Sequence, residues 1–370
     1  MWAGLVGRRG AGVTGGSLRP HGGQALALAR ELGCPPSTIL DFSASLNPLG
    51  PADEVLAAAR AALDDACHYP ENDASGLAGA LAAHHGLPAV CVLAGAGATE
   101  FIFLLPRVLR PRRVLLVEPA FGEYRPALVQ AGAQIDAFQL DPAAEFRLDP
   151  VALGAALRPD TDLVWLANPL NPAGTGYPRG LLLALRATLP PTVSLVVDEA
   201  FVDFAPHLSV ADQVVSSPNL VVLRSLTKFY ALAGLRIGWL AAAPELAARL
   251  AAGREPWRLS TPAIAAGLAC LQADALRTAT LQAIPVLRAE LAAGLAKLGC
   301  TVYPSVANYL LCRLPANAPG ATELAAHLRP QRILVRPCPD FAGLDDRHLR
   351  LAVRSAADNR RLLAELSKFL

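Results

Sequence analysis

The sequence predicts an α/β fold with a large domain built on a mostly parallel, mixed sheet and a smaller α+β domain. Between residues 90 and 245, short apolar runs alternate with helical segments. These runs are apolar throughout, which is typical of parallel strands covered by helices on both faces. After about residue 255 the alternation stops, and a long Ala- and Leu-rich segment is followed by several short apolar runs.

The expected strands of the large sheet are short runs that are mostly rich in apolar residues. The expected strands are residues 92–94, 114–118, 134–140, 163–167, 194–198, 220–224 and 237–242. Two of the expected helices between them are residues 100–109 and 181–188.

The smaller domain is expected to combine a long helix with short strands. Its expected elements are one helix at 261–298, strands at 302–303, 309–313, 333–335 and 349–353, and a closing helix that ends at residue 370. The predicted organisation has four parts: a flexible lead-in (1–20), an N-terminal arm that joins the small domain (21–50), a large domain (51–255) and a small C-terminal domain (256–370).

The composition of the chain argues against several classes of function. Charged residues make up 17% of the chain and the formal net charge is +2, so we expect no nucleic-acid-binding surface. Mean hydropathy is positive, but no run of 18 uninterrupted apolar residues occurs, so we expect no membrane-spanning helix. The seven cysteines contain no CxxC pair, which favours free thiols in a reducing compartment, the cytoplasm. The histidines show no metal-binding spacing, and we expect no metal site.

A carboxylate ends one of the most apolar strands. Asp198 directly follows Val196 and Val197, and open α/β sheets bind ligands beyond the carboxyl ends of their strands. A buried carboxylate there needs a cationic partner, or it takes up a proton. A protonated ring nitrogen of a cofactor is one such partner. An Asp that begins the next turn is the alternative, and this motif alone does not decide between them.

A lysine and three polar side chains follow the strand at 220–224. Ser225, Thr227 and Lys228 come directly after it, and Arg236 follows eight residues later. An amine in apolar surroundings loses its proton more easily, which favours a Schiff base with a carbonyl compound. The two hydroxyls and the guanidinium can surround a phosphate. The alternative is a surface lysine after a strand.

Two further loops carry groups that can bind a phosphate or a phenolate oxygen. Gly97 and its neighbours Ala96 and Ala98 lie between a strand and a helix, where backbone N–H groups can bind one phosphate. Glu100 replaces the third glycine of a dinucleotide-binding motif, so that function is disfavoured. Asn168 follows the strand at 163–167, and its amide can donate to a phenolate oxygen.

In this order and spacing, the motifs resemble those of fold-type-I pyridoxal 5′-phosphate (PLP) enzymes of the histidinol-phosphate aminotransferase group, from about residue 21 onward. The resemblance implies a PLP-dependent transferase fold. It also implies three catalytic roles: Lys228 forms the Schiff base, Asp198 pairs with the pyridine nitrogen and Asn168 binds the 3′ oxygen. Phe121 is implied to stack on the ring. The residues implied to hold the cofactor phosphate are Ala96, Gly97, Ala98, Ser225, Thr227 and Arg236.

Tyr69, which precedes Pro70, resembles the tyrosine that reaches the cofactor phosphate of the neighbouring subunit in this group. The resemblance therefore implies a homodimer with shared active sites.

Within the group, three segments resemble the threonine-phosphate decarboxylase family. They are His21-Gly22-Gly23, the stretch 41–50 (DFSASLNPLG) and the stretch 198–204 (DEAFVDF). Phe201 stands where the aminotransferases usually have Tyr. The resemblance implies that His21 and Gly22 lie near the phosphate of the substrate. Ser45, Leu170 and Ser260 depart from the family pattern, which affects the expected substrate contacts and not the cofactor residues.

Arg336 and Arg350 resemble the anion-binding arginines of this group, and a phosphorylated amino acid has two anionic ends for them. The resemblance implies decarboxylation of O-phospho-L-threonine to (R)-1-aminopropan-2-yl phosphate for cobalamin biosynthesis. A histidinol-phosphate-type aminotransferase is the main alternative. A PLP-binding regulator is the third, although the 20-residue lead-in is too short for the DNA-binding module of that class.

Overall fold

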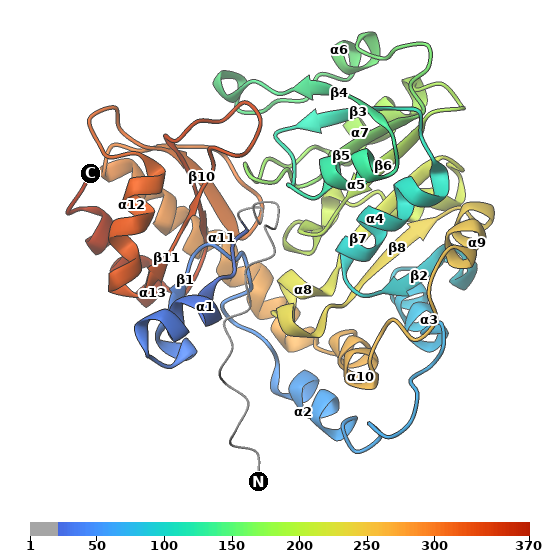
Figure 1. Cartoon of the computed structure of the whole chain (residues 1–370), viewed down its shortest axis with the longest axis horizontal. Coiled ribbons are helices and arrows are strands. Elements are labelled where there is room, and N and C mark those ends of the chain that lie inside the picture. The colour runs from blue at the N-terminus through green and yellow to red at the C-terminus, as the bar shows by residue number, and fades with distance from the viewer. Residues whose placement is uncertain (1–20) are drawn as a thin grey trace, which may run out of the picture.

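The computed structural model describes residues 21–370, and the predicted lead-in at residues 1–20 lies outside the described residues. Figure 1 shows two regions: a larger one that contains the sheet of β2 to β8, and a smaller one that combines the C-terminal elements with α1 and β1 and contains two small sheets. No helix in the described part of the chain is long and apolar enough to cross a membrane.

The larger region is built on a seven-stranded sheet with the order β2-β8-β7-β6-β5-β3-β4. Its strands are β2 (Val92–Gly95), β3 (Arg113–Glu118), β4 (Gln134–Gln139), β5 (Leu163–Ala167), β6 (Ser194–Asp198), β7 (Leu220–Ser225) and β8 (Gly238–Ala242). Strands β4, β3, β5, β6 and β7 pair in parallel, and β8 pairs antiparallel with both β7 and β2. The predicted mostly parallel, mixed sheet is confirmed.

The reversed strand β8 brings a distant segment to the functional edge. Gly238, its first residue, pairs with Ser225 at the end of β7 and with Gly95 at the end of β2. Because β8 runs in the opposite direction, the residues that precede it lie where the other strands end. Arg236 is thereby placed beside the residues that follow β2 and β7.

Successive residues of the central strands face opposite sides of the sheet. Val164 and Leu166 of β5 belong to one hydrophobic core, whereas Leu163 and Trp165 belong to another. Both faces are therefore buried, which explains why these strands are apolar throughout. One face is covered by α4 (Ala98–Leu109), α5 (Tyr124–Gln130) and α9 (Pro244–Ala252). Helices on the other face include α2 (Asp53–Ala61), α3 (Ser75–His84), α6 (Pro150–Ala155), α7 (Arg179–Thr188) and α10 (Thr261–Cys270).

The smaller region has two sheets. One is antiparallel, with the order β12-β13-β10-β9, and consists of β9 (Thr301–Val302), β10 (Tyr309–Arg313), β12 (Arg336–Pro337) and β13 (His348–Ala352). In the other, β1 (Leu40–Asp41) pairs in parallel with β11 (Ile333–Leu334). The remaining helices are α1 (Ala25–Leu32), α8 (Leu226–Phe229), α11 (Asp274–Lys297), α12 (Ala321–Leu328) and α13 (Ala356–Leu366). The domain limits near residues 50 and 255 stay a prediction.

Three expectations for this region are wrong. The closing helix ends at Leu366, not at residue 370. The predicted helix at 261–298 is two helices, because the chain turns at residues 271–273, where Leu271 and Ala273 are buried. This turn lets α10 pack on α2 and α3 while α11 packs against α13 and β10. The predicted strand at 333–335 ends at Leu334, and Arg336 begins a separate strand of the other sheet.

Candidate active site

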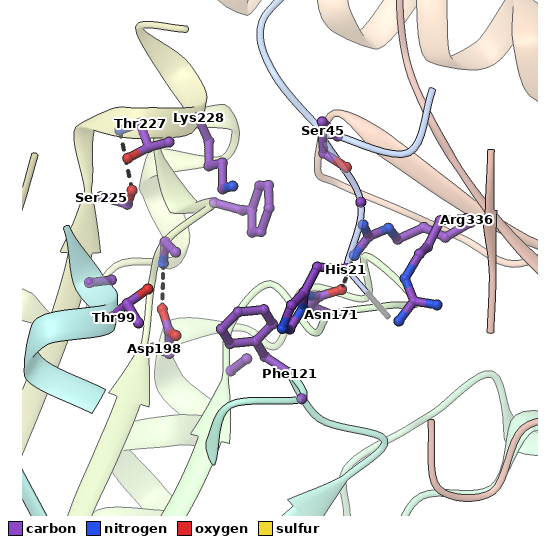
Figure 2. A pocket seen from close by; sticks show the side chains of 18 of the residues that line it. His21, Ser45, Thr99, Phe121, Asn171, Asp198, Ser225, Thr227, Lys228 and Arg336 are labelled. Carbon is purple, nitrogen blue, oxygen red and sulfur yellow. Dashed lines mark hydrogen bonds between the residues drawn. The ribbon is translucent and has the colours of Figure 1, made fainter. Parts of the chain in front are cut away.

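A cavity of about 410 Å³ lies at the edge of the large sheet where β5, β6 and β7 end. That volume is typical of sites for small ligands and cofactors. Segments from the sheet, the N-terminal arm and the smaller region all contribute to its wall. Figure 2 shows Thr99, Asp198, Ser225, Thr227 and Lys228 toward one side of it, and Asn171 and Arg336 toward the other.

Lys228 projects into this cavity from α8, the short helix that follows β7. Burial lowers the pKa of Lys228 to about 8, and the positive charges of Arg350 and Arg236 act in the same direction. Its Nζ lies 5.8 Å from the ring centroid of Phe201. A neutral amine is the nucleophilic form, so this environment suits a lysine that attacks a carbonyl carbon.

Asp198 ends β6 and lines the same cavity. Burial raises the pKa of Asp198, while hydrogen bonds to the carboxylate oppose that effect. Tyr124 donates its phenolic O–H to Asp198 Oδ2 over 2.6 Å, and the backbone N–H of Ala200 donates to Oδ1 over 2.9 Å. These donors fix the carboxylate at the cavity wall, where a bound cation would further stabilise its charged form.

The predicted phosphate-binding residues converge at the N-terminus of α4. Ala98, Ser225, Thr227 and Arg236 all line the cavity. Gly97 precedes the helix with φ +80°, and a Cβ atom there would lie 2.9 Å from Arg236 Nη2. The backbone conformation at this position therefore requires glycine, and the missing side chain lets the guanidinium lie close to the loop. A helix N-terminus beside hydroxyls and an arginine is suited to a phosphate.

The prediction for Asn168 is wrong. Both ends of its amide bond the backbone of Tyr177: Nδ2 donates to the carbonyl over 3.0 Å, and Oδ1 accepts from the N–H over 2.8 Å. Asn168 is fully buried and does not line the cavity, whereas Asn171 does. In the segment from Asn168 to Gly174, Asn171 therefore faces the cavity, while Asn168 holds the segment in place through its bonds to Tyr177.

Arg350 and Arg336 both line the cavity, but their partners differ. Arg350 donates to the side-chain oxygen of Asn171 over 2.6 Å and to the Ser43 carbonyl over 2.9 Å, and both acceptors are neutral. Its Nε is buried without a hydrogen-bond partner among the described residues. Arg336 instead forms a two-point salt bridge with Asp340, which also lines the cavity.

The N-terminal arm closes another side of the cavity with His21 and Gly22. His21 Nε2 lies 2.8 Å from Glu123 Oε1, and the imidazole ring lies 6.1 Å from that of Phe121. A Cβ atom on Gly22 would lie 2.1 Å from the Ser43 carbonyl oxygen, so only glycine lets the arm approach so closely. The structure thus brings His21 and Gly22 to the same cavity as Lys228.

Two predicted aromatic residues take different positions. Phe121 lines the cavity. Tyr69 does not line the cavity of its own chain; it is 82% exposed and packs against Trp257, with ring centroids 4.8 Å apart.

Several cavity residues were not predicted from the sequence. Tyr124 and Asp340 carry no motif of their own, and only the fold brings them to the cavity. Ser45 departs from the family pattern, and its buried hydroxyl lines the cavity without a hydrogen-bond partner among the described residues. Asn171 lies three residues after Asn168 in the same loop, and the sequence alone does not show which of the two asparagines faces the cavity.

Comparison with known proteins agrees with this geometry. Residues 37–366 match the model of the family described as aminotransferase class I and II. Threonine-phosphate decarboxylase of Salmonella typhimurium is 42% identical over 95% of this chain and 96% of its own length. Histidinol-phosphate aminotransferase of Symbiobacterium thermophilum is 37% identical, over 92% of each chain.

Among solved structures, histidinol-phosphate aminotransferase from Sinorhizobium meliloti in complex with pyridoxal 5′-phosphate superimposes with a TM-score of 0.83. The two chains are 25% identical, and the match covers 93% of this chain and 94% of the other.

Proposed function

The chain belongs to the aminotransferase class I and II family, and from this premise we propose that it is a PLP-dependent lyase, a threonine-phosphate decarboxylase. It converts O-phospho-L-threonine to (R)-1-aminopropan-2-yl phosphate and CO₂. The observation that carries the proposal is the presence of Arg336 and Arg350 in the same cavity as the buried amine of Lys228. Two guanidinium groups suit a substrate with a carboxylate and a phosphate.

The residues of the cavity fit PLP. Lys228 supplies an amine whose pKa is lowered to about 8, and Asp198 supplies a buried carboxylate suited to a protonated ring nitrogen. The loop at Gly97 has no room for a Cβ atom beside Arg236, and it lies next to Ser225 and Thr227. We assign the aldehyde to Lys228, the ring nitrogen to Asp198 and the phosphate to this loop, with Phe121 against the ring.

When bound, PLP supplies an electron sink for the bond that breaks at the α-carbon of the substrate. The protein decides which bond breaks by orienting the substrate. Arg350 binds one anionic group with donors fixed by Asn171 and the Ser43 carbonyl, while His21 and Arg336 face the same space. Lys228 holds or delivers a proton near the α-carbon, and its lowered pKa suits that exchange near neutral pH.

Phe201 favours the decarboxylase over the aminotransferase. Its ring is buried and packs edge-on against Tyr309, with centroids 4.9 Å apart. A phenol at this position could donate a hydrogen bond into the site, and phenylalanine cannot. The 42% identity to a threonine-phosphate decarboxylase supports the same choice.

The proposal extends to the biological setting. We infer a role in cobalamin biosynthesis and a homodimer in which Tyr69 reaches the site of the partner subunit. We also infer a cytoplasmic location, which is supported by seven cysteines that are all free.

The test is a product assay with the PLP-loaded protein, O-phospho-L-threonine and no keto acid. We expect CO₂ and aminopropanol phosphate in equal amounts, and no product from a Lys228→Ala variant. Conversion of histidinol phosphate that depends on 2-oxoglutarate, without release of CO₂, would instead establish the aminotransferase.

His21→Ala should raise the KM for the substrate and leave the affinity for PLP unchanged.

A further inference from the structure

Arg336 is already paired with an anion inside the cavity. Its Nη1 donates to Asp340 Oδ1 over 2.9 Å, and its Nη2 donates to Asp340 Oδ2 over 2.6 Å. This is the two-point geometry with which arginine binds carboxylates and phosphates. The Asp340 carboxylate thus occupies the donors that an anionic ligand of Arg336 needs.

We propose that Asp340 competes with the substrate for Arg336. The anionic group of the substrate must displace the Asp340 carboxylate from Arg336 before the substrate binds fully. The inference rests on the proposed function in one respect, because it takes the substrate's phosphate as the displacing group. Asp340 is a positioning residue that acts through Arg336 and sets how strongly the cavity binds anions.

The surroundings of the pair support displacement of Asp340 and not of Arg336. The Arg336 side chain is only 10% exposed, its Nη1 also donates to the Pro337 carbonyl, and its guanidinium lies 5.1 Å from the ring centroid of Phe341. The Asp340 side chain is 33% exposed and belongs to a turn after β12. The guanidinium is therefore held by several contacts, while its carboxylate partner has access to solvent.

The charges of the two competing anions also favour displacement of Asp340 by phosphate. A phosphate dianion carries more charge and more acceptor oxygens than a carboxylate, so it gains more from the same guanidinium. Arg350 offers a contrast, because its hydrogen-bond acceptors are the neutral Asn171 and Ser43. Among residues 21–370, no carboxylate is hydrogen-bonded to Arg350 where an incoming anion would bind.

The test is calorimetric titration of the PLP-loaded protein with inorganic phosphate, which requires no turnover. In Asp340→Asn, phosphate should bind about fivefold more tightly, the ratio that corresponds to about 1 kcal/mol for one partly exposed ion pair. The KM for the phosphorylated substrate should fall by a similar factor. Asp340→Glu, which restores a carboxylate, should return both values toward those of the parent.

Asp358→Asn is the matched control. Asp358 pairs with Arg354 at the same i,i+4 spacing and with a similar exposure of 24%, and neither residue lines the cavity. It should leave phosphate binding unchanged. A gain of affinity in Asp340→Asn alone supports competition, since loss of a merely structural contact would not tighten binding.

Unchanged or weaker phosphate binding in Asp340→Asn would overturn the inference and make Asp340 a structural support of Arg336. If that variant does not fold, Asp340→Ala with the same titration decides the matter. Failure of the decarboxylase assay with a positive phosphate titration would reject the proposed substrate and keep the role of Asp340.

Discussion

Lys228 has surroundings that weaken its hold on a proton. Its pKa falls to about 8 from an ordinary 10.5, so half of the amine is neutral at pH 8, against about 0.3% for an unperturbed lysine. In the cofactor-free protein, the rate of acetylation of Lys228 should rise with pH, reach half of its maximum near pH 8 and level off more than one pH unit higher. Peptide mass spectrometry after competitive labelling measures this midpoint.

Two comparisons make the labelling experiment decisive. Exposed Lys297 serves as an internal control in the same digest. Arg350→Gln removes a positive charge that lowers the pKa of Lys228, and should therefore move the midpoint upward. A midpoint near 10.5 in the parent protein would contradict the expected environment.

At the end of a strand, the sequence fixes the direction of a side chain well enough to predict that it lies in the cavity. Asp198, Ser225 and Lys228 directly end or follow strands, and all three line the cavity as expected. Asn168 also follows a strand, but the next loop residues fold back and its amide bonds Tyr177. The direction of an amide in a loop depends on partners that sequence spacing does not reveal.

At the level of elements, a buried ion network joins the ends of β6 and β7. Arg224 donates to Glu199 Oε2 over 3.2 Å and also to Asp203, and all three side chains are buried. Burial raises the pKa of Glu199. These residues adjoin Asp198 and Ser225, so the network fixes the spacing between the two strand ends that carry cofactor residues.

Arg224→Met should destabilise the protein by about 3–5 kcal/mol, because it leaves two buried carboxylates without their cation. Urea denaturation measures the change. Arg179→Met, which breaks the more exposed pair with Asp212, should cost only about 0–1 kcal/mol. Adding Glu199→Gln and Asp203→Asn to Arg224→Met should recover part of the loss. Equal effects of Arg224→Met and Arg179→Met would refute this view of the network.

The central strands of the large sheet were predictable because burial on both faces demands continuous apolar runs, whereas the edge strand β4 is only partly buried. β5 and β6 have the predicted limits, and the others differ by one residue at one end. The turn between α10 and α11 was not predictable, since Ala and Leu continue through it and only packing against α2 and α3 requires it. The reversed direction of β8 likewise has no local signal.

At the scale of the whole molecule, the predicted homodimer makes Tyr69 a residue of the neighbouring site. Its 82% exposure and its packing against the half-exposed Trp257 leave it accessible to a partner subunit. Lys228→Ala and Tyr69→Ala should each be nearly inactive alone. Co-expressed with separate tags, they should form hybrids with one intact site, which gives about a quarter of the parent activity if subunits pair at random.

Lys228→Ala co-expressed with Asp198→Ala is the matched control for these hybrids. Both side chains line one cavity of one chain, so each site of that hybrid lacks one of them and stays inactive. If Tyr69→Ala also fails to complement Lys228→Ala, Tyr69 does not act across subunits.

The cavity joins segments that leave the ribosome at very different times. Ser43 accepts a hydrogen bond from Arg350, 307 positions later, whereas the residues proposed to hold the cofactor are all synthesised by Arg236. The 114 residues from 237 to 350 take roughly 6–23 s to translate at about 5–20 residues per second. During that interval a nascent chain has the groups proposed to capture the cofactor, but lacks the arginine proposed to orient the substrate. Catalytic competence therefore comes late in synthesis.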